Sequence, residues 1–93
     1  SNYPKTMLWV EKGGNLIVNN HGSYKGSTFL NFAGTTAKIS GGNYEIARSQ
    51  YNSEVGIVAF DFDKGEDVTI ENAKIQVGDY CNGVRAYDLN STL

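Results

Sequence analysis

Two ten-residue segments, AKISGGNYEI at 37–46 and VTIENAKIQV at 68–77, carry one pattern of apolar residues at an offset of 31. Within each segment, polar residues alternate with apolar ones, which is the period-2 pattern of strands that turn one face inward. The pattern predicts two short strands per segment, separated by a turn. The matched inward positions are Ala37, Ile39, Tyr44 and Ile46 in the first segment and Val68, Ile70, Ile75 and Val77 in the second.

A second pair of segments, GIVAFD at 56–61 and GVRAYD at 83–88, matches in residue class at an offset of 27. The difference between the offsets lies in the connection, where residues 47–55 are replaced by the shorter 78–82. A stack of repeats tolerates such variation, because the loop projects outward. A weaker upstream copy needs a gap: Val18–Gly22 and Tyr24 match Ile39–Gly42 and Tyr44, and Phe29–Phe32 matches Ile57–Phe60.

The recurrence predicts an all-β protein built as a parallel β-solenoid of about three coils. One unit cannot bury its own apolar face, whereas stacked units about 4.8 Å apart form continuous apolar columns. We assign the coils to residues 15–36, 37–67 and 68–93, with 1–14 as an N-terminal cap or edge segment. The expected buried columns contain Ile39, Ile70, Ile46, Val77, Ile57 and Val84. A β-sandwich is the alternative, but it gives no reason for whole segments to recur.

The length and composition of the chain narrow the classes of function that it can have. A chain of 93 residues is one small domain with a modest core. Its net charge of −2 argues against nucleic acid as a partner, because phosphate backbones need a concentrated basic surface. No apolar stretch approaches the roughly 18 residues of a membrane-spanning helix. The single cysteine, Cys81, excludes an intrachain disulfide.

The run Val68-Thr69-Ile70, Ala73–Gly78 and Gly83–Ala86 resembles coils of right-handed parallel β-helices. It is most similar to the passenger repeats of autotransporter adhesins, in which a strand ending in Val-Gly is followed by a short loop and a Gly-Val-x-Ala strand. Phage tailspikes and pectin-lyase-like enzymes share this fold, and fold does not determine function. The resemblance implies an extracellular or bacterial cell-surface location and brings no catalytic residues that map onto this chain.

We therefore expect a non-enzymatic surface segment, an adhesin-like scaffold whose loop face binds a host glycan or a surface protein. One alternative is a virion segment of a tailspike or tail fibre that acts on polysaccharide as a hydrolase or lyase. Another is a small stand-alone binding or inhibitor protein. The final strand carries Val84, Ala86, Tyr87 and Leu89 with few charged residues, which predicts self-association at the C-terminal edge, or contact there with further coils of a parent chain.

The expected loop face lies in the variable connection between the repeats. Stacked loops would place Tyr51 beside Tyr80, with polar and charged groups around the two rings, as sugar- and protein-binding surfaces require. The alternative is that each tyrosine packs over its own loop. The candidate binding residues are Arg48, Tyr51, Asn52, Asp79, Tyr80 and Asn82.

Three acidic residues, Asp61, Asp63 and Asp67, surround Gly65 and form a weak candidate for a Ca²⁺ site. The alternative, which we favour, is a solvated acidic turn, so no cofactor is expected. At the offset of 27, Asp61 stacks on Asp88, which would create a carboxylate pair of the kind that glycosidases use. Two exposed aspartates that turn apart are the simpler interpretation. His21, the only histidine, is expected in a surface turn.

Overall fold

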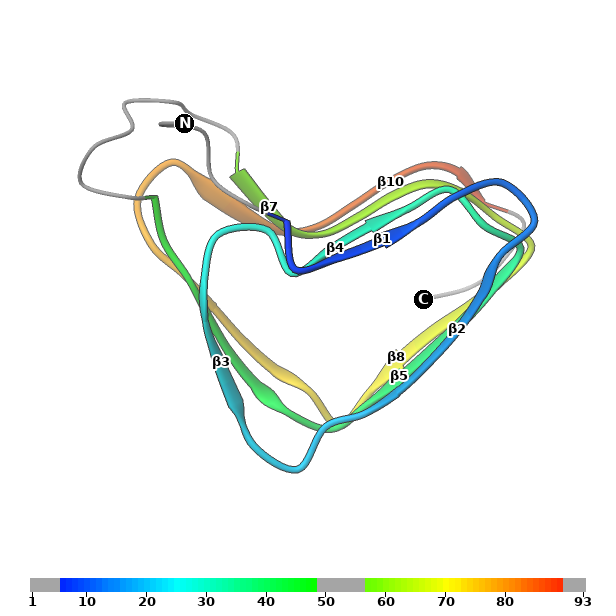
Figure 1. Cartoon of the computed structure of the whole chain (residues 1–93). Coiled ribbons are helices and arrows are strands. Elements are labelled where there is room, and N and C mark those ends of the chain that lie inside the picture. Colours follow the sequence, from blue (N-terminus) through cyan, green and yellow to red (C-terminus); the bar gives the residue numbers. More distant parts are fainter. Residues whose placement is uncertain (1–5, 49–56, 90–93) are drawn as a thin grey trace.

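The computed structural model describes residues 6–48 and 57–89, which form ten strands (Figure 1). Within these ranges there is no helix, and so none that could cross a membrane. The all-β class predicted from the sequence is confirmed. The strands are β1 (Leu8–Val10), β2 (Asn15–Asn19), β3 (Ser23–Gly26), β4 (Leu30–Phe32), β5 (Thr36–Ser40), β6 (Asn43–Ile46), β7 (Ile57–Gly65), β8 (Asp67–Glu71), β9 (Lys74–Val77) and β10 (Cys81–Leu89).

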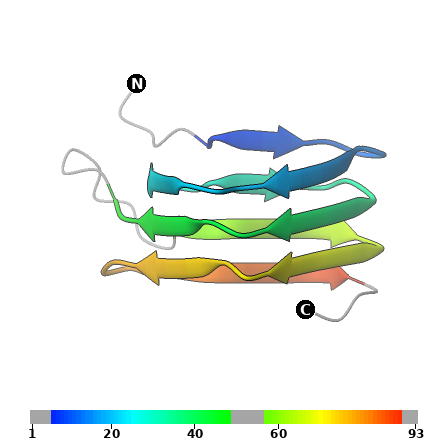
Figure 2. The same cartoon turned by 90° about the horizontal axis from the view of Figure 1, so that it is seen from below.

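The strands form three sheets in which all neighbours are parallel. Sheet A has the order β1-β4-β7-β10, sheet B the order β2-β5-β8, and sheet C the order β3-β6-β9. Neighbours in a sheet are three strands apart in the chain. The backbone therefore passes through the three sheets in turn and returns one strand spacing further along, which gives the stacked layers of Figure 2. Leu8–Val10, within the expected cap segment 1–14, is itself a strand of sheet A.

The register of sheets B and C confirms the predicted offset of 31. Ile39 pairs with Ile70 in sheet B, and Ile46 pairs with Val77 in sheet C. The upstream copy also lies where the sequence placed it, because Val18 pairs with Ile39 and Tyr24 with Tyr44. The gap that this copy needed falls in the turn between β2 and β3.

The register predicted for sheet A is wrong. In sheet A, β10 pairs with β7 at an offset of 24, so Val84 lies beside Phe60 and Cys81 beside Ile57. The predicted pairs of Ile57 with Val84 and of Asp61 with Asp88 do not exist; Asp61 lies beside Arg85, and Asp88 beside Lys64. The observed offset is three residues smaller than the predicted offset of 27. Because three is an odd number, this shift exchanges the two faces of the strand. Upstream, Leu30 pairs with Phe60 at an offset of 30 instead of 28, an even slip that leaves the faces unchanged.

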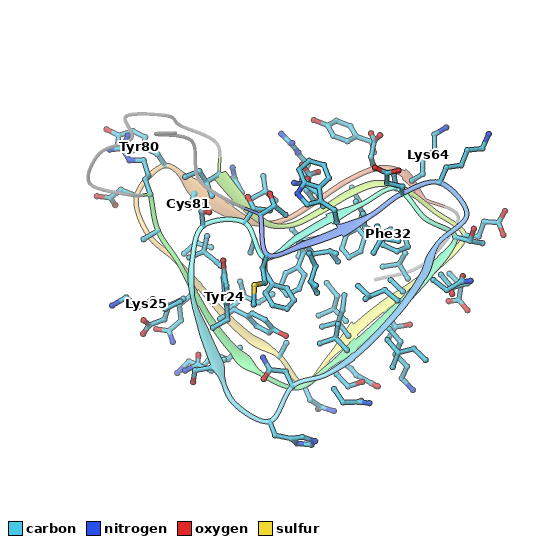
Figure 3. All side chains as sticks on the ribbon, viewed as in Figure 1. Tyr24, Lys25, Phe32, Lys64, Tyr80 and Cys81 are labelled. Carbon is cyan, nitrogen blue, oxygen red and sulfur yellow. The ribbon has the colours of Figure 1, made fainter. Side chains whose placement is uncertain are left out.

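The core is an aromatic cluster in the middle of the stack. The ring of Tyr44 meets Phe29 at a centroid distance of 4.8 Å and Phe60 at 5.0 Å, both edge to face. Tyr24 joins the cluster through an edge-to-face contact with Phe29 at 5.1 Å. In Figure 3, Tyr24 and Phe32 project into the interior enclosed by the three sheets. These contacts hold sheets A and C together, because edge-to-face aromatic pairs add to the stabilisation from burial.

Burial decreases from the middle of the stack towards its end. Ile39, Ile46 and Ile57 are buried as predicted, whereas Ile70 is only partly buried. The predicted burial of Val77 and Val84 is wrong: they are 44% and 41% exposed. Both belong to the outermost strands β9 and β10, beyond which the described residues place no further strand.

Candidate ligand-binding groove

A row of side chains crosses the outer face of sheet A. Trp9 pairs with Asn31, Asn31 with Asp61, and Asp61 with Arg85, so that one residue of each strand lies in the row. The row faces outward because its members alternate with residues whose side chains point into the core, such as Leu30, Phe32, Phe60 and Phe62. The pleat of four parallel strands thus aligns one aromatic, one amide, one carboxylate and one guanidinium group.

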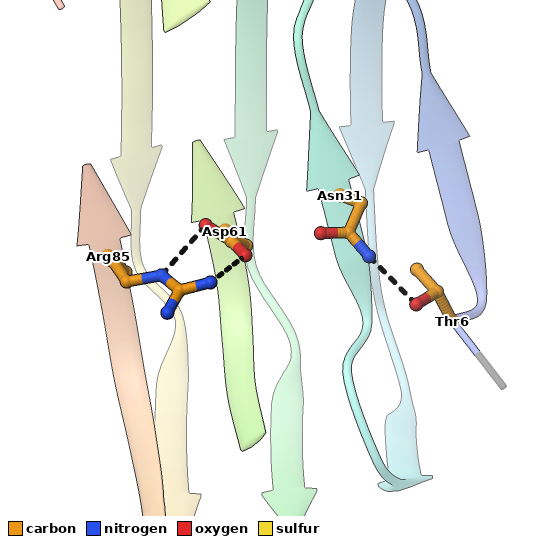
Figure 4. A network of polar contacts seen from close by, with 4 residues as sticks. All are labelled: Thr6, Asn31, Asp61 and Arg85. Carbon is orange, nitrogen blue, oxygen red and sulfur yellow. Dashed lines mark hydrogen bonds and ion pairs between the residues drawn. The ribbon is translucent and has the colours of Figure 1, made fainter. Parts of the chain in front are cut away.

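Hydrogen bonds hold this row in place (Figure 4). Arg85 Nη2 donates to Asp61 Oδ2 at 2.6 Å, and Arg85 Nε donates to Asp61 Oδ1 at 3.2 Å. This two-point hydrogen bond raises the pKa of Arg85 above its already high value, so the guanidinium stays charged. On the other side of the row, Asn31 Nδ2 donates to Thr6 Oγ1 at 2.9 Å.

The row forms the floor of a groove of about 330 Å³. Figure 1 shows why the surface is hollow, since the four strands of sheet A curve inward and leave their outer side concave. Trp9 on β1 and Tyr87 on β10 line the groove on opposite edge strands, and they are 69% and 66% exposed. The guanidinium carbon of Arg85 lies 5.2 Å from the centre of the Tyr87 ring. The groove therefore has aromatic side chains at both edges and hydrogen-bonding groups between them.

The predicted loop face lies elsewhere, at the corner between sheets C and A. There, Arg48 stacks on the ring of Tyr80 at 4.4 Å, so residues from two circuits do come together. Asp79, Tyr80 and Asn82 are exposed, and Tyr80 has a positive φ of 64°. Tyr51 and Asn52 lie outside the described residues.

The weak calcium candidate is not assembled as a site. Asp61 is paired with Arg85, Asp63 lines the groove, and Asp67 begins β8 in sheet B. In residues 6–48 and 57–89, no three histidine, cysteine or acidic side chains converge on a point that would hold a metal ion.

His21 is exposed in the turn between β2 and β3. The thiol of Cys81 lies 3.5 Å from the carbonyl oxygen of Asp79.

Sequence reasoning missed the groove residues Trp9, Asn31, Arg85 and Tyr87. The offset of 27 matched Tyr87 to Phe60, whereas the observed pairing of Arg85 with Asp61 places Tyr87 beside Asp63 on the outer face of sheet A. One signal was available for Trp9, which lies between the apolar Leu8 and Val10 and so faces the opposite side of the strand from them.

Comparison of the chain with protein-family models, with characterised proteins and with solved structures found no match.

Proposed function

We propose that the chain is a non-enzymatic, glycan-binding segment of an extracellular surface protein, built as a parallel β-solenoid of about three coils. The parallel pairing of every third strand supports the solenoid. The scaffold is of the kind found in adhesins and autotransporter passengers, located on a bacterial cell surface. The binding surface is the groove on sheet A, in place of the loop face around Tyr80.

One observation carries this proposal: two large aromatic side chains are exposed on opposite edges of a concave, polar-floored groove. Exposed tryptophan and tyrosine present an apolar ring face together with a polar group, and a sugar ring has the same mixed character. The four strands from β1 to β10 span roughly 14 Å at the usual strand spacing. That length suits an extended oligosaccharide better than a single sugar.

The chemistry of the floor favours binding over catalysis. Glycoside hydrolysis needs one carboxylic acid and one carboxylate on either side of the bond that breaks. Asp61 accepts two hydrogen bonds from the charged Arg85, so both of its carboxylate oxygens are already engaged. Asn31 and Asp63 then serve as hydrogen-bonding partners for sugar hydroxyls.

Affinity electrophoresis in gels that contain single polysaccharides tests the proposal. We expect at least one polysaccharide to retard the native protein, and Trp9→Ala or Tyr87→Ala to lower the apparent affinity by about tenfold or more, as for loss of a central aromatic contact. Tyr80→Ala is the matched control, because it removes an equally exposed aromatic residue from the loop face. Loss of retardation in Tyr80→Ala with retention in Trp9→Ala would move the site to the loop face.

A second candidate function is polysaccharide cleavage, favoured by the presence of Asp61 and Asp63 in the same groove. We expect no release of reducing ends or of unsaturated products from any polysaccharide that is bound. Turnover that is abolished by Asp63→Asn or Asp61→Asn would replace the binding proposal by a hydrolase or lyase.

A further inference from the structure

A second hollow adjoins the groove, at the corner where the chain passes from sheet A to sheet B. Three turns stack there, one from each circuit: residues 11–14, residues 33–35, and Glu66 together with the end of β7. They surround a pocket of about 260 Å³ whose lining includes Lys12, Gly34, Thr35, Lys64 and Glu66. Lys12 belongs to the first turn and Lys64 to the end of β7 that leads into the third, so the two lysines lie on either side of the middle turn.

Backbone hydrogen bonds fix the spacing of the three turns. The amide of Thr35 donates to the carbonyl of Gly14 at 2.7 Å, and the amide of Glu66 donates to the carbonyl of Thr35 at 2.8 Å. The middle turn lies so close to the first that a side chain at Gly34 would collide with the carbonyl oxygen of Gly14. The backbones of the outer turns are therefore roughly 10 Å apart, which is two strand spacings, with small residues between them.

The charge at this corner is positive although the chain as a whole is negative. Two ammonium groups and one carboxylate, that of Glu66, line the pocket. Lys64 also lies beside Asp88 of β10 in the register of sheet A. The lining of the pocket carries one more ammonium group than carboxylates, and this excess of positive charge attracts an anion.

The corner pocket is continuous with the groove, since Lys12 and Ala33 line both. A chain-like ligand that passes Trp9 and Tyr87 reaches the two lysines without leaving the surface. We infer that the ligand is an acidic polysaccharide, and that a carboxylate or sulfate group of it binds between Lys12 and Lys64. This inference rests on the glycan-binding function proposed above, and it adds the class of glycan.

Matched polysaccharides separate this inference from the function on which it rests. Affinity electrophoresis would compare dextran with carboxymethyl-dextran and dextran sulfate, and hydroxyethyl cellulose with carboxymethyl cellulose and cellulose sulfate. Within each set the sugar backbone is constant and only the charged group changes. We expect the native protein to bind a charged member about tenfold more tightly than its neutral counterpart, as charge-assisted hydrogen bonds from two lysines allow. The carboxymethyl and sulfate members show which acid group the pocket prefers.

The variant Lys12→Gln/Lys64→Gln should lose this preference and bind the charged and neutral members of each set with similar affinity. Lys74→Gln, at an exposed lysine of β9 outside both pockets, controls for the loss of positive charge and should behave as the native protein. An undiminished preference for charged members in the double variant, or a native preference for neutral ones, would overturn the inference and leave the glycan-binding function intact. Absence of binding to every member of both sets, and to all other polysaccharides tested, would overturn both.

Discussion

At the scale of single residues, the phenol of Tyr44 stands out in the core. Its ring is fully buried, and its hydroxyl is the one buried side-chain polar atom in the described residues that has no hydrogen-bond partner. A buried unpaired hydroxyl costs about 1–3 kcal/mol in lost hydration. The aromatic contacts of the ring with Phe29 and Phe60 offset that cost.

We therefore expect Tyr44→Phe to keep the free energy of unfolding unchanged or to raise it by about 1 kcal/mol, because it removes the hydroxyl and retains the ring. Tyr44→Ala should lower it by about 3–5 kcal/mol, because it also opens a cavity. Urea denaturation of the native protein and of both variants measures these values. A clear loss of stability in Tyr44→Phe would mean that the hydroxyl has a polar partner.

Tyr24 makes the stability of the fold depend on pH. Burial raises the pKa of its phenol, and the hydroxyl donates to the carbonyl of Ser27 at 3.2 Å. A folded-state pKa above the unfolded value of about 10 stabilises the fold fully below pH 10, and this contribution is lost as the pH rises through the folded-state value. We expect the free energy of unfolding to fall above pH 10 and to fall less steeply in Tyr24→Phe. Urea denaturation between pH 8 and pH 11 tests this, and an equal slope in both proteins would contradict it.

At the scale of the elements, two of the turns between sheets B and C, β5–β6 and β8–β9, share a residue in the left-handed conformation. Gly41 has a φ of 77°, and Asn72, 31 residues later, has a φ of 55°. Glycine, and to a lesser degree asparagine, adopts this left-handed conformation at low cost. The amide of Gly41 donates to the carbonyl of Glu71 at 2.9 Å, so the two turns stack directly.

We expect Gly41→Ala to lower the free energy of unfolding by about 2–3 kcal/mol. It combines left-handed strain of about 1 kcal/mol with a clash, since a Cβ at this position would lie 2.5 Å from the carbonyl oxygen of Asn20. Asn72→Gly is the matched change in the opposite direction, and it should be neutral or slightly stabilising. Thermal and urea denaturation measure both, and a neutral Gly41→Ala would show that the turn can shift.

At the scale of the whole molecule, the last circuit presents apolar side chains that no described strand covers. Val77 and Val84 belong to β9 and β10, which have one paired neighbour each. Such strand edges recruit further strands unless charge or proline blocks them. This supports the proposal that the C-terminal edge contacts another copy of the chain or further coils of a parent protein.

We expect the isolated chain to self-associate as its concentration rises, and Val84→Lys to reduce the association, because it places a charge at the end of the apolar column. Light scattering over a concentration series measures the average mass. Thr69→Lys, at a partly exposed position of β8, controls for the added charge. A native chain that stays monomeric at high concentration would contradict the exposed-edge argument.

Alternation of apolar and polar residues was sufficient to predict the strand-rich class, the inward faces of sheets B and C, and the offset of 31 between the two best-matched segments. These follow from sequence because the period of two assigns each side chain to a face, and the short turns between β5 and β6 and between β8 and β9 leave no freedom in the pairing.

Only the tertiary structure decided the register of sheet A and, with it, the groove. The segments GIVAFD and GVRAYD match in residue class. The pairing of β10 with β7 nevertheless depends on the path of the two connections before these strands, which differ in length. Residue class does not specify such a path. Trp9 and Arg85 lie at opposite ends of the sequence, and they share a row because parallel strands stacked in register bring together residues from every circuit.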